Sequence, residues 1–590
     1  MEPFAAVGGF WFQNRGDVPL ERSCSLFLEW CAPLLTDAEL DETRAAVDDF
    51  LTGPGPVLQA ELAAYDGDES NDGWLDEFWR DRYLGRRDPI AINANFFFRF
   101  KPDPSQGTTQ TERAASLLSR AADLRLRIDR GQIEALPESM RQMRHLFCTT
   151  RIPGPARDSV RTQYSADSPG PSDARHAVVF HRGAIYALDV LDESGTPYSI
   201  AALDVALQSI LSSAAEQPDG VGVLTTGPRA RWADDRKALL AADPANADAL
   251  TIVESAMCGL ALEDGQPADL TQLDSTLLGG SGRDRWFDLA TTFIVFPDGT
   301  AGLNGEHCLL DGMTILRLID DLFKSRDRIA GVPGDPEVRA IEFALNDDVR
   351  SRIARASEDF AHLSAQTALL HVPLEGLSRN VAKALGYSPD AFFQMMLQIA
   401  HARARGRVGA TYESIATRAW RNGRTEAMRV VTPESVALVE VMGDPAATDE
   451  QRRGAFEAAA KAHVARARAC QSGDAPEQHL WELDRIRERR GDQLGITEQP
   501  ALFRSPGWRI MRDDWLSTST AVTTNVQSWG FGATSPTCIG VGYALLTDSA
   551  YVGLSTPTPV ADQMQHLATE LQHTITTVTP ILEPNAAHSG

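Results

Sequence analysis

Residues 293–323 constrain the fold of this chain more than any other segment, because two strand-like runs lead directly into an amphipathic helix. The apolar runs 293–296 (FIVF) and 301–303 (AGL) flank Pro-Asp-Gly-Thr, a sequence typical of a hairpin turn. Farther on, residues 316–323 repeat an apolar residue at steps of three and four, which is the spacing of an apolar helix face. A strand followed by a helix that packs on the sheet predicts an α/β fold.

The same mixture of elements recurs elsewhere in the chain. Residues 177–190 (AVVFHRGAIYALDV) form two apolar runs around a His-Arg-Gly turn, which predicts a second hairpin. Residues 200–210 repeat an apolar residue every three or four positions, which predicts a helix after it. Residues 1–90 follow helical spacing, with Asp37 as the expected cap of one helix.

The length of 590 residues implies more than one hydrophobic core, since single cores stop growing at about 250–300 residues. Both halves mix strands and helices, and the segment 331–336 (GVPGDP) breaks helix and strand alike, so it is the candidate linker. We expect a helical entry subdomain over residues 1–90, an α/β domain over 91–345 and a similar α/β domain over 346–590.

The net charge bears on the class of ligand. Asp and Glu number 81 against 56 Lys and Arg, which gives a net charge of −25. Such a protein repels nucleic acid and an anionic membrane surface, so we expect neither as a partner. An anionic ligand needs a local basic pocket here, which makes a pair of basic residues beside a ligand motif informative.

Seven cysteines are spread along the chain without Cys-x-x-Cys or Cys/His metal spacing, a pattern typical of reduced thiols. The N-terminal sequence has neither a basic segment nor a long apolar core, and no stretch reaches about 18 uninterrupted apolar residues. We therefore expect a cytoplasmic protein that holds no metal and is not anchored to a membrane. The sequence leaves the oligomeric state open, with a monomer as the expectation.

The strongest candidate for chemistry is His307, which the hairpin pattern places at the end of a strand, just before the expected helix. Histidine suits proton abstraction because its unperturbed pKa lies near neutral pH, although any one of the 12 histidines can be a packed or surface residue. Asp311, four positions on, either orients the imidazole or pairs with a structural cation. Cys308 adjoins His307, where neighbouring side chains of a strand point apart, so we interpret it as a packing residue.

The string His-x-x-x-Asp-Gly that begins at His307 resembles the motif of chloramphenicol acetyltransferase, peptide-synthetase condensation domains and carnitine acyltransferases. Further segments extend the resemblance to the choline/carnitine acyltransferase family over nearly the whole chain, in the family's order. They are a Trp-rich helix at 74–79, a strand expected at 89–93, and the segments 151–155 (RIPGP), 388–392 (SPDAF), 410–414 (ATYES), 423–425 (GRT) and 516–519 (LSTS).

The resemblance implies two chloramphenicol-acetyltransferase-like α/β domains with mixed sheets and flanking helices, and an active-site tunnel at their interface. It also implies that His307 deprotonates an acceptor hydroxyl, which attacks an acyl-CoA thioester without a metal or a covalent acyl-enzyme. A thioester is already activated, so orientation, proton removal and oxyanion stabilisation suffice. Ser519 matches the serine that donates to the oxyanion. Acyl-CoA is then a co-substrate, and no further cofactor is expected.

For CoA, the resemblance implies two basic residues that hold the 3′-phosphate, which correspond here to Arg379 and Lys383. Because they are four residues apart, we expect them on one side of a helix, either as a cationic clamp or as an ordinary solvated face. Asp390 and Ser414 correspond to contacts with the pantetheine and the nucleotide.

For the acceptor, Tyr412, Thr425 and Ser517 match residues that bind the carnitine carboxylate, and Phe531 matches an aromatic residue that faces its quaternary ammonium. Gln478 departs from the family, whose carnitine enzymes have an acceptor-binding arginine at this position. The loss of a bidentate carboxylate partner is not conservative, so we expect carnitine to be a poor acceptor.

Trp529 occupies the position of an acyl-length gate in the family, bulky in short-chain enzymes and glycine in longer-chain ones; core packing is the alternative. The sequence thus predicts a CoA-dependent O-acyltransferase that moves a short acyl group to the hydroxyl of a small acceptor. One alternative is condensation-type transfer from a carrier-protein thioester or to a natural-product alcohol, and another is a catalytically silent binding protein. The basic pair favours free CoA, and the complete set of candidate catalytic residues favours an enzyme.

Overall fold

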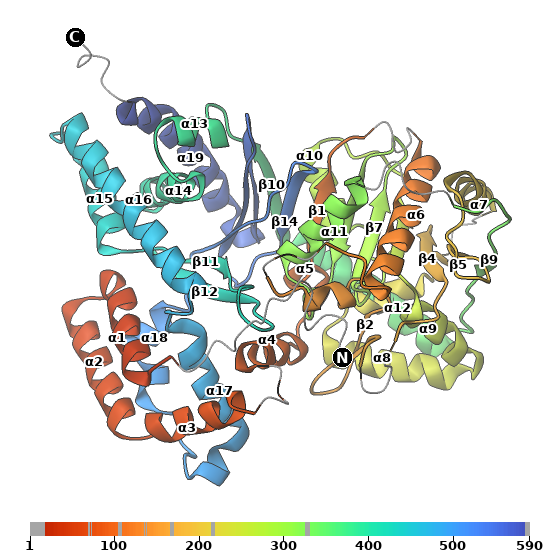
Figure 1. The fold of residues 1–590 in the computed structure, drawn as a ribbon, viewed down its shortest axis with the longest axis horizontal. Coiled ribbons are helices and arrows are strands. Elements are labelled where there is room, and N and C mark those ends of the chain that lie inside the picture. The colour runs from red at the N-terminus through yellow and green to blue at the C-terminus, as the bar shows by residue number, and fades with distance from the viewer. Residues whose placement is uncertain are drawn as a thin grey trace.

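The computed structural model describes residues 18–583, apart from 69–70, 72, 104–108, 135, 137, 166–169, 214–216, 218 and 325–330. Two mixed β-sheets with flanking helices stand side by side (Figure 1). This is the two-sheet α/β architecture that the sequence predicts. Among the described residues, none of the helices has both the length and the apolar composition needed to cross a bilayer.

Within the described residues, the first sheet has eight strands, in the order β14-β1-β8-β7-β6-β4-β5-β9. Strand β6 runs parallel to β4 and β7, and the other neighbours are antiparallel. The hairpins β4–β5 and β7–β8 are the two that the sequence predicts. The strand bounds are β1 (Phe96–Phe100), β4 (His176–His181), β5 (Ala184–Asp189), β6 (Gly259–Leu262), β7 (Thr291–Val295), β8 (Ala301–Gly305), β9 (Val338–Ala340) and β14 (Val526–Phe531).

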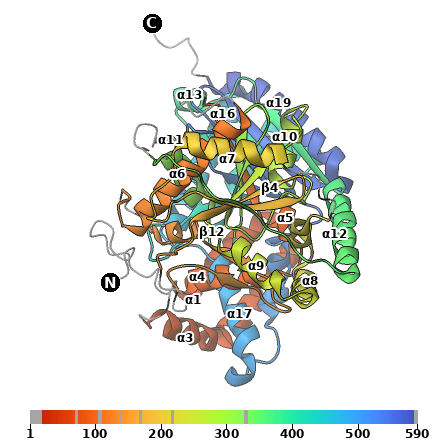
Figure 2. The same cartoon turned by 90° about the vertical axis from the view of Figure 1, so that its right-hand side faces the viewer.

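Helices cover both faces of this sheet, which explains its nearly continuous apolar strands. Phe96, Phe98 and Phe100 of β1 pack in one core, and Phe97 packs in the core on the opposite face. Figure 2 shows β4 between α7 and α9, one from each covering layer. The first layer contains α6 (Gln110–Asp129), α7 (Ile200–Ser213) and α11 (Gly312–Lys324), and the second contains α8 (Arg229–Ala242), α9 (Ala245–Ser255), α10 (Leu270–Leu278) and α12 (Asp347–Ala365).

The edge strand β14 comes from the C-terminal half of the sequence but pairs with β1 in the first sheet (Figure 1). Trp529 lies opposite Phe98 in this pairing, and the two rings stack with their centroids 5.8 Å apart. The Trp529 indole Nε1 donates a hydrogen bond to the main-chain oxygen of Tyr543 in the second sheet, at 3.2 Å. One strand therefore ties the two sheets together. At the opposite edge, β9 pairs with β5, so the chain leaves the first sheet beyond the candidate linker 331–336.

In the described part of the chain, the second sheet has six strands, in the order β10-β16-β15-β13-β11-β12. Its strands are β10 (Thr367–Pro373), β11 (Thr411–Ala416), β12 (Thr425–Arg429), β13 (Leu516–Thr520), β15 (Ile539–Leu545) and β16 (Ala550–Pro557). It shares a core with α14 (Pro389–Arg405), α15 (Pro433–Gly443), α16 (Asp449–Gln471) and α19 (Ala561–Leu582), and α13 (Arg379–Ala384) precedes α14. A separate ribbon joins β2 (Thr150–Ile152) to β3 (Ser159–Arg161).

The N-terminal helices pack against two helices from late in the sequence, at the lower left of Figure 1. These elements are α1 (Leu20–Cys31), α2 (Asp37–Thr52), α3 (Gly55–Asp66), α4 (Trp74–Leu84), α17 (Glu477–Leu494) and α18 (Pro506–Ile510). Helix α4 continues toward the first sheet, so the entry helices are positioned to contribute to a site between the two sheets.

Two local predictions are wrong. The strand expected at 89–93 is instead the short helix α5 (Ile90–Asn93), and β1 begins at Phe96. Helix α2 is capped by Thr36 rather than Asp37, because Thr36 has the extended backbone of a cap whereas Asp37 is already helical. The Thr36 hydroxyl and the Glu39 carboxylate accept hydrogen bonds from each other's main-chain nitrogens, which completes a capping box.

Candidate active site

A cavity of about 610 Å³ lies between the two sheets, lined by β11 to β14, by α4, by the turn after β8 and by the start of α17. Arg379, Lys383 and Gln478 are not among the lining residues. The sequence-predicted site residues that line it are His307, Asp311, Asp390, Tyr412, Ser414, Thr425, Ser517, Ser519, Trp529 and Phe531. Segments that are hundreds of residues apart in the sequence therefore meet around one space.

His307 lies two residues beyond the end of β8, and its side chain is 27% exposed. Its ring Nδ1 is 2.7 Å from the main-chain oxygen of Leu310. A carbonyl oxygen can only accept, so Nδ1 carries the hydrogen and Nε2 has the free lone pair. The imidazole is therefore held in the tautomer that can take up a proton at Nε2.

Two aromatic rings enclose the His307 imidazole. Tyr83 of α4 stacks on it with the ring centroids 4.6 Å apart, and Phe96 of β1 meets it edge-on at 4.8 Å. Burial lowers the pKa of His307 below the ordinary value; the Asp311 carboxylate opposes this change and the Arg424 guanidinium adds to it. A lowered pKa keeps the imidazole neutral at pH 7, the state that a general base requires.

Asp311 is engaged mainly with Arg424. The Arg424 Nη2 is 2.8 Å from the Asp311 Oδ1, whereas the His307 Nδ1 is 3.8 Å from the same oxygen. Gln142 donates to the Asp311 Oδ2 at 2.6 Å. Burial opposes ionisation of Asp311, but Arg424 outweighs it and lowers the pKa of this carboxyl to about 2. Of the two roles considered for Asp311, its shorter contacts fit the ion pair.

Arg424 also fixes the backbone of the turn that carries His307. Its guanidinium donates to the main-chain oxygens of Cys308 at 2.8 Å and of His307 at 3.1 Å. The Gly-Arg-Thr motif predicted a role only for Thr425, so Arg424 is a functional residue that the sequence did not identify. The available signal was that arginine is the one charged residue of this motif.

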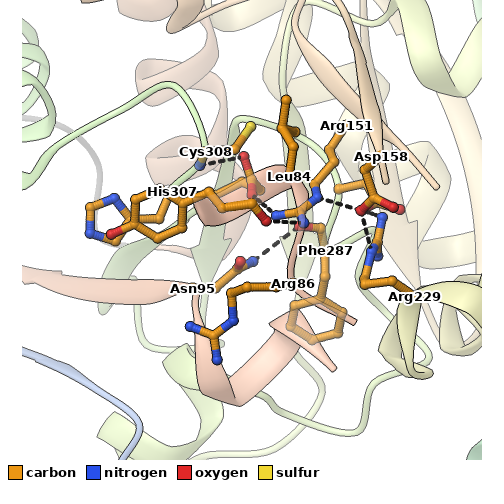
Figure 3. Close-up of polar contacts among 12 residues, drawn as sticks. Leu84, Arg86, Asn95, Arg151, Asp158, Arg229, Phe287, His307 and Cys308 are labelled. Carbon is orange, nitrogen blue, oxygen red and sulfur yellow. Dashed lines mark hydrogen bonds and ion pairs between the residues drawn. The ribbon is translucent and has the colours of Figure 1, made fainter. Parts of the chain in front are cut away.

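A buried chain of ion pairs continues from the other side of the turn (Figure 3). The Glu306 carboxylate accepts a hydrogen bond from the Cys308 main-chain nitrogen at 2.9 Å and pairs with Arg151 at 3.0 Å. Arg151 in turn pairs with Asp158 at 2.7 Å, and Asp158 pairs with Arg229 at the same distance. Charged side chains thus anchor the His307 turn on both sides, and the close-up shows the side that runs from Cys308 to Arg229.

Ser517 and Ser519 lie on β13, beside the strand that carries Tyr412. Strand β13 runs parallel to β11, with Tyr412 opposite Ser517. A Cβ placed at Gly312, the first residue of α11, would lie 3.7 Å from the Cβ of Ala521. The end of β13 therefore lies next to the start of the helix that follows His307, which places Ser519 and His307 on adjoining parts of the cavity wall.

Asp390 belongs to a buried polar cluster. The Tyr543 hydroxyl lies 2.5 Å from the Asp390 carboxylate and 2.9 Å from that of Glu413, and His463 Nε2 is 2.8 Å from Glu413. Burial and the Glu413 charge raise the pKa of Asp390 to about 7. Asp390, Glu413 and His463 are close enough to hold a cation, but hydrogen bonds already connect all three.

Arg379 and Lys383 are exposed on the short helix α13, four residues apart. Within the described residues neither has an ion-pair partner. The next helix, α14, carries Asp390 in its first turn, where that residue lines the cavity. The pair is thus free to meet an anion that extends outward past Asp390.

Gln478 lies in the first turn of α17 and is fully buried away from the cavity. Its neighbour Glu477 lines the cavity, and so does Trp481 one turn later. Three of the arginines that line the cavity, none of them predicted from the sequence as a site residue, accompany Glu477 and Trp481, namely Arg82, Arg429 and Arg512. The structure therefore places cations at this end of the cavity although position 478 is neutral.

Comparison with known proteins gives concordant results. Residues 18–573 match the model of a family described as Choline/Carnitine o-acyltransferase. The chain is 30% identical over 579 residues to the mitochondrial carnitine O-palmitoyltransferase 2 of Rattus norvegicus, covering 90% of this chain and 86% of that one.

The names of two further relatives specify different acyl groups. The chain is 29% identical to the peroxisomal carnitine O-octanoyltransferase of Bos taurus, over 84% of each chain. It is 27% identical to the carnitine O-acetyltransferase of Columba livia, over 89% of this chain and 86% of that one. Similarity alone therefore leaves the length of the acyl group open.

Proposed function

The chain belongs to the choline/carnitine O-acyltransferase family and is an acyltransferase, and we propose that it moves a short acyl group from acyl-CoA to a small alcohol with His307 as the general base. The observation that carries this proposal is the hydrogen bond between the His307 Nδ1 and the main-chain oxygen of Leu310. This bond leaves Nε2 as the basic nitrogen in a cavity lined by both sheets.

In the proposed reaction, the His307 Nε2 removes the proton from the acceptor hydroxyl as the oxygen attacks the thioester carbonyl carbon. The tetrahedral intermediate then collapses, the carbon–sulfur bond breaks, and the imidazolium returns the proton to the departing CoA thiolate. The products are an O-acyl ester and free CoA. A neutral imidazole that is already oriented avoids reorganisation during the reaction.

We assign stabilisation of the oxyanion to Ser519. Its position on β13, next to the start of α11, supports a hydroxyl donor close to the His307 turn. A donor that is in place before charge develops on the carbonyl oxygen lowers the barrier more than one that must be recruited.

We place CoA along α13 and the start of α14. The exposed Arg379 and Lys383 would meet the 3′-phosphate, and Asp390 and Ser414, which line the cavity, would meet the pantetheine and nucleotide. Two exposed cations four residues apart, neither with an ion-pair partner in the described chain, form a local positive site in a protein with a net charge of −25, which supports the clamp over a solvated face.

We place the acceptor against Tyr412, Thr425, Ser517 and Phe531, all of which line the cavity. Trp529 would close the acyl pocket. Its ring is held on one side by Phe98 and at its indole nitrogen by the main chain of Tyr543. A fixed, bulky ring supports a preference for short acyl groups.

The proposal is tested by incubating the purified protein with acetyl-, octanoyl- or palmitoyl-CoA and a panel of small alcohols that includes carnitine and choline. Free thiol is measured together with the O-acyl ester by mass spectrometry, and the alcohol is omitted as a control. We expect equal amounts of ester and CoA, fastest with acetyl-CoA. Thiol release at the same rate without any alcohol would contradict acyl transfer and indicate hydrolysis instead.

A further inference from the structure

The Trp481 indole lies beside two guanidinium groups at one end of the cavity. The Arg82 Cζ is 4.2 Å from the centre of the Trp481 ring, and the Arg512 Cζ is 4.8 Å from it. The three residues come from α4, from α17 and from the segment just before β13, and all three line the cavity. An aromatic ring that holds two cations limits the directions in which their N–H groups can point.

Arg82 differs from every other arginine that lines the cavity. Each of the others has a carboxylate within 3.3 Å, whereas among the described residues no carboxylate lies within 4.0 Å of the Arg82 guanidinium. The paired arginines are Arg86 with Asp88, Arg418 with Glu138, Arg424 with Asp311, and Arg429 and Arg512 with Glu477. Arg82 is exposed to the cavity. Its charge is therefore available to a ligand.

Arg512 is only partly satisfied by its carboxylate. Glu477 lies 2.7 Å from Arg429 but 3.2 Å from Arg512, and the buried Nε and Nη2 of Arg512 make no hydrogen bond within the described residues. Burial lowers the pKa of Arg512 to about 10, and the charges of Arg429 and Arg82 act in the same direction. Three guanidinium groups here face two carboxylates, those of Glu477 and Asp514. This excess of positive charge favours the binding of an anion.

We propose that Arg82 and Arg512 bind an anionic group of the acceptor, and so take over the role that the neutral residue at position 478 cannot play. The acceptor is then a hydroxy compound that carries a carboxylate or a similar anion. This inference rests on the proposed function and corrects the expectation that the substitution at 478 makes carnitine a poor acceptor. That expectation followed from the missing family arginine at 478, where the Gln478 side chain is buried and does not line the cavity.

The acceptor is a better occupant than the phosphates of CoA. Arg429 lies over the Tyr412 ring at 5.7 Å and shares Glu477 with Arg512. Tyr412 is the contact that we assign to the acceptor. The cations proposed for CoA, Arg379 and Lys383, lie on α13, outside the cavity lining.

The test compares L-carnitine with its neutral amide, which keeps the hydroxyl and the quaternary ammonium but lacks the negative charge. Dissociation constants for both ligands are measured by calorimetry on the full chain, and kcat/KM is measured with acetyl-CoA. We expect carnitine to bind roughly 10- to 150-fold more tightly than the amide, the effect of one hydrogen bond to a charged group. Arg82→Gln should collapse this ratio toward one, and Arg82→Lys should retain part of it.

The matched control is Arg86→Gln, which removes a cavity arginine that is already paired with Asp88; it should keep the ratio of the wild type. Equal affinity of the wild type for the two ligands, no measurable binding of carnitine, or a ratio that survives Arg82→Gln would overturn the inference. A wild type that binds carnitine more tightly than the amide but acylates no alcohol of the panel would leave the anion site standing and contradict the proposed function.

Discussion

The Nδ1 nitrogen of His307 lies 2.7 Å from the main-chain oxygen of Leu310, and this contact determines which ring nitrogen can act as a base. Leu310 is held in place by the turn that Arg424 and Glu306 anchor through the oxygens of His307 and Cys308 and the nitrogen of Cys308. The tautomer of the proposed base is thus set by a rigid backbone turn rather than by a carboxylate partner.

The pH dependence of turnover follows from the lowered pKa of His307. The protonated imidazole cannot act as a base, so kcat/KM should be constant above neutral pH and fall as the pH drops through the pKa of His307. Because burial lowers this pKa, the midpoint should lie below about 6.5, the ordinary value. A midpoint above 6.5, or no decline on the acid side, would contradict the assignment.

Asp311→Asn should destabilise the fold by about 3–5 kcal/mol, since it leaves the buried Arg424 charge without its partner. The measurement is urea unfolding at pH 7. The matched control is Asp41→Asn, which breaks an exposed ion pair with Arg44 and should change stability by less than about 0.5 kcal/mol. Equal effects of the two substitutions would show that Asp311 does not hold the turn.

The Asp311–Arg424 ion pair also predicts how the free energy of unfolding changes at acid pH. The pKa of Asp311 in the folded state is about 2, below the ordinary 3.8. The stabilisation from its charged form is therefore fully present above pH 4 or so and is lost as the pH falls toward 2. Acid unfolding of the wild type should show this loss, and Asp311→Asn should lack it; identical acid profiles would argue against the ion pair.

Removing both candidate CoA cations should remove recognition of the 3′-phosphate. With wild-type protein, the KM for an acyl-dephospho-CoA should exceed that for acyl-CoA about 10-fold, the value of one charge-assisted hydrogen bond. Arg379→Ala/Lys383→Ala should abolish the difference. Lys461→Ala/Arg468→Ala, which removes two exposed charges from α16, should preserve it. A double variant at 379 and 383 that still discriminates would refute the clamp.

Trp529→Gly should open the acyl pocket. We expect the ratio of kcat/KM for octanoyl-CoA to that for acetyl-CoA to rise at least ~10-fold, since one methylene in a fitted pocket is worth ~10- to 200-fold. Replacing this buried ring lowers stability, so the two rate constants of each ratio are measured on the same variant. Trp529→Phe keeps most of the bulk and should keep the ratio of the wild type. An unchanged ratio in Trp529→Gly would mean that Trp529 only packs.

Local sequence patterns predicted the elements around the proposed base. The hairpin β7–β8 and the helix α11 depend on apolar spacing within about 30 residues, and the structure confirms them. The strand predicted at 89–93 was wrong because three apolar residues between Pro89 and Asn93 fit a single helical turn as well as a strand. Short runs of this kind lack a period that would distinguish the two.

The contents of the cavity depend on contacts that no local pattern contains. Strand β14 joins the first sheet across more than 400 residues of sequence, and Arg82, Trp481 and Arg512 meet from three separate segments. The sequence motif identifies position 478 but does not tell where its side chain points. In the structure, Gln478 lies in the first turn of α17 and its side chain is buried. Such placement follows from tertiary packing, so only the structure could assign this end of the site.

The most direct test of the account is the rate of ester formation from acetyl-CoA by His307→Ala, measured by mass spectrometry with the best acceptor from the alcohol panel. The control His566→Ala removes an exposed histidine on α19, and circular dichroism verifies that both variants fold. We predict that His307→Ala loses about 100-fold or more in kcat, the scale of general-base catalysis, while His566→Ala matches the wild type. A folded His307→Ala with nearly wild-type turnover would contradict the mechanism.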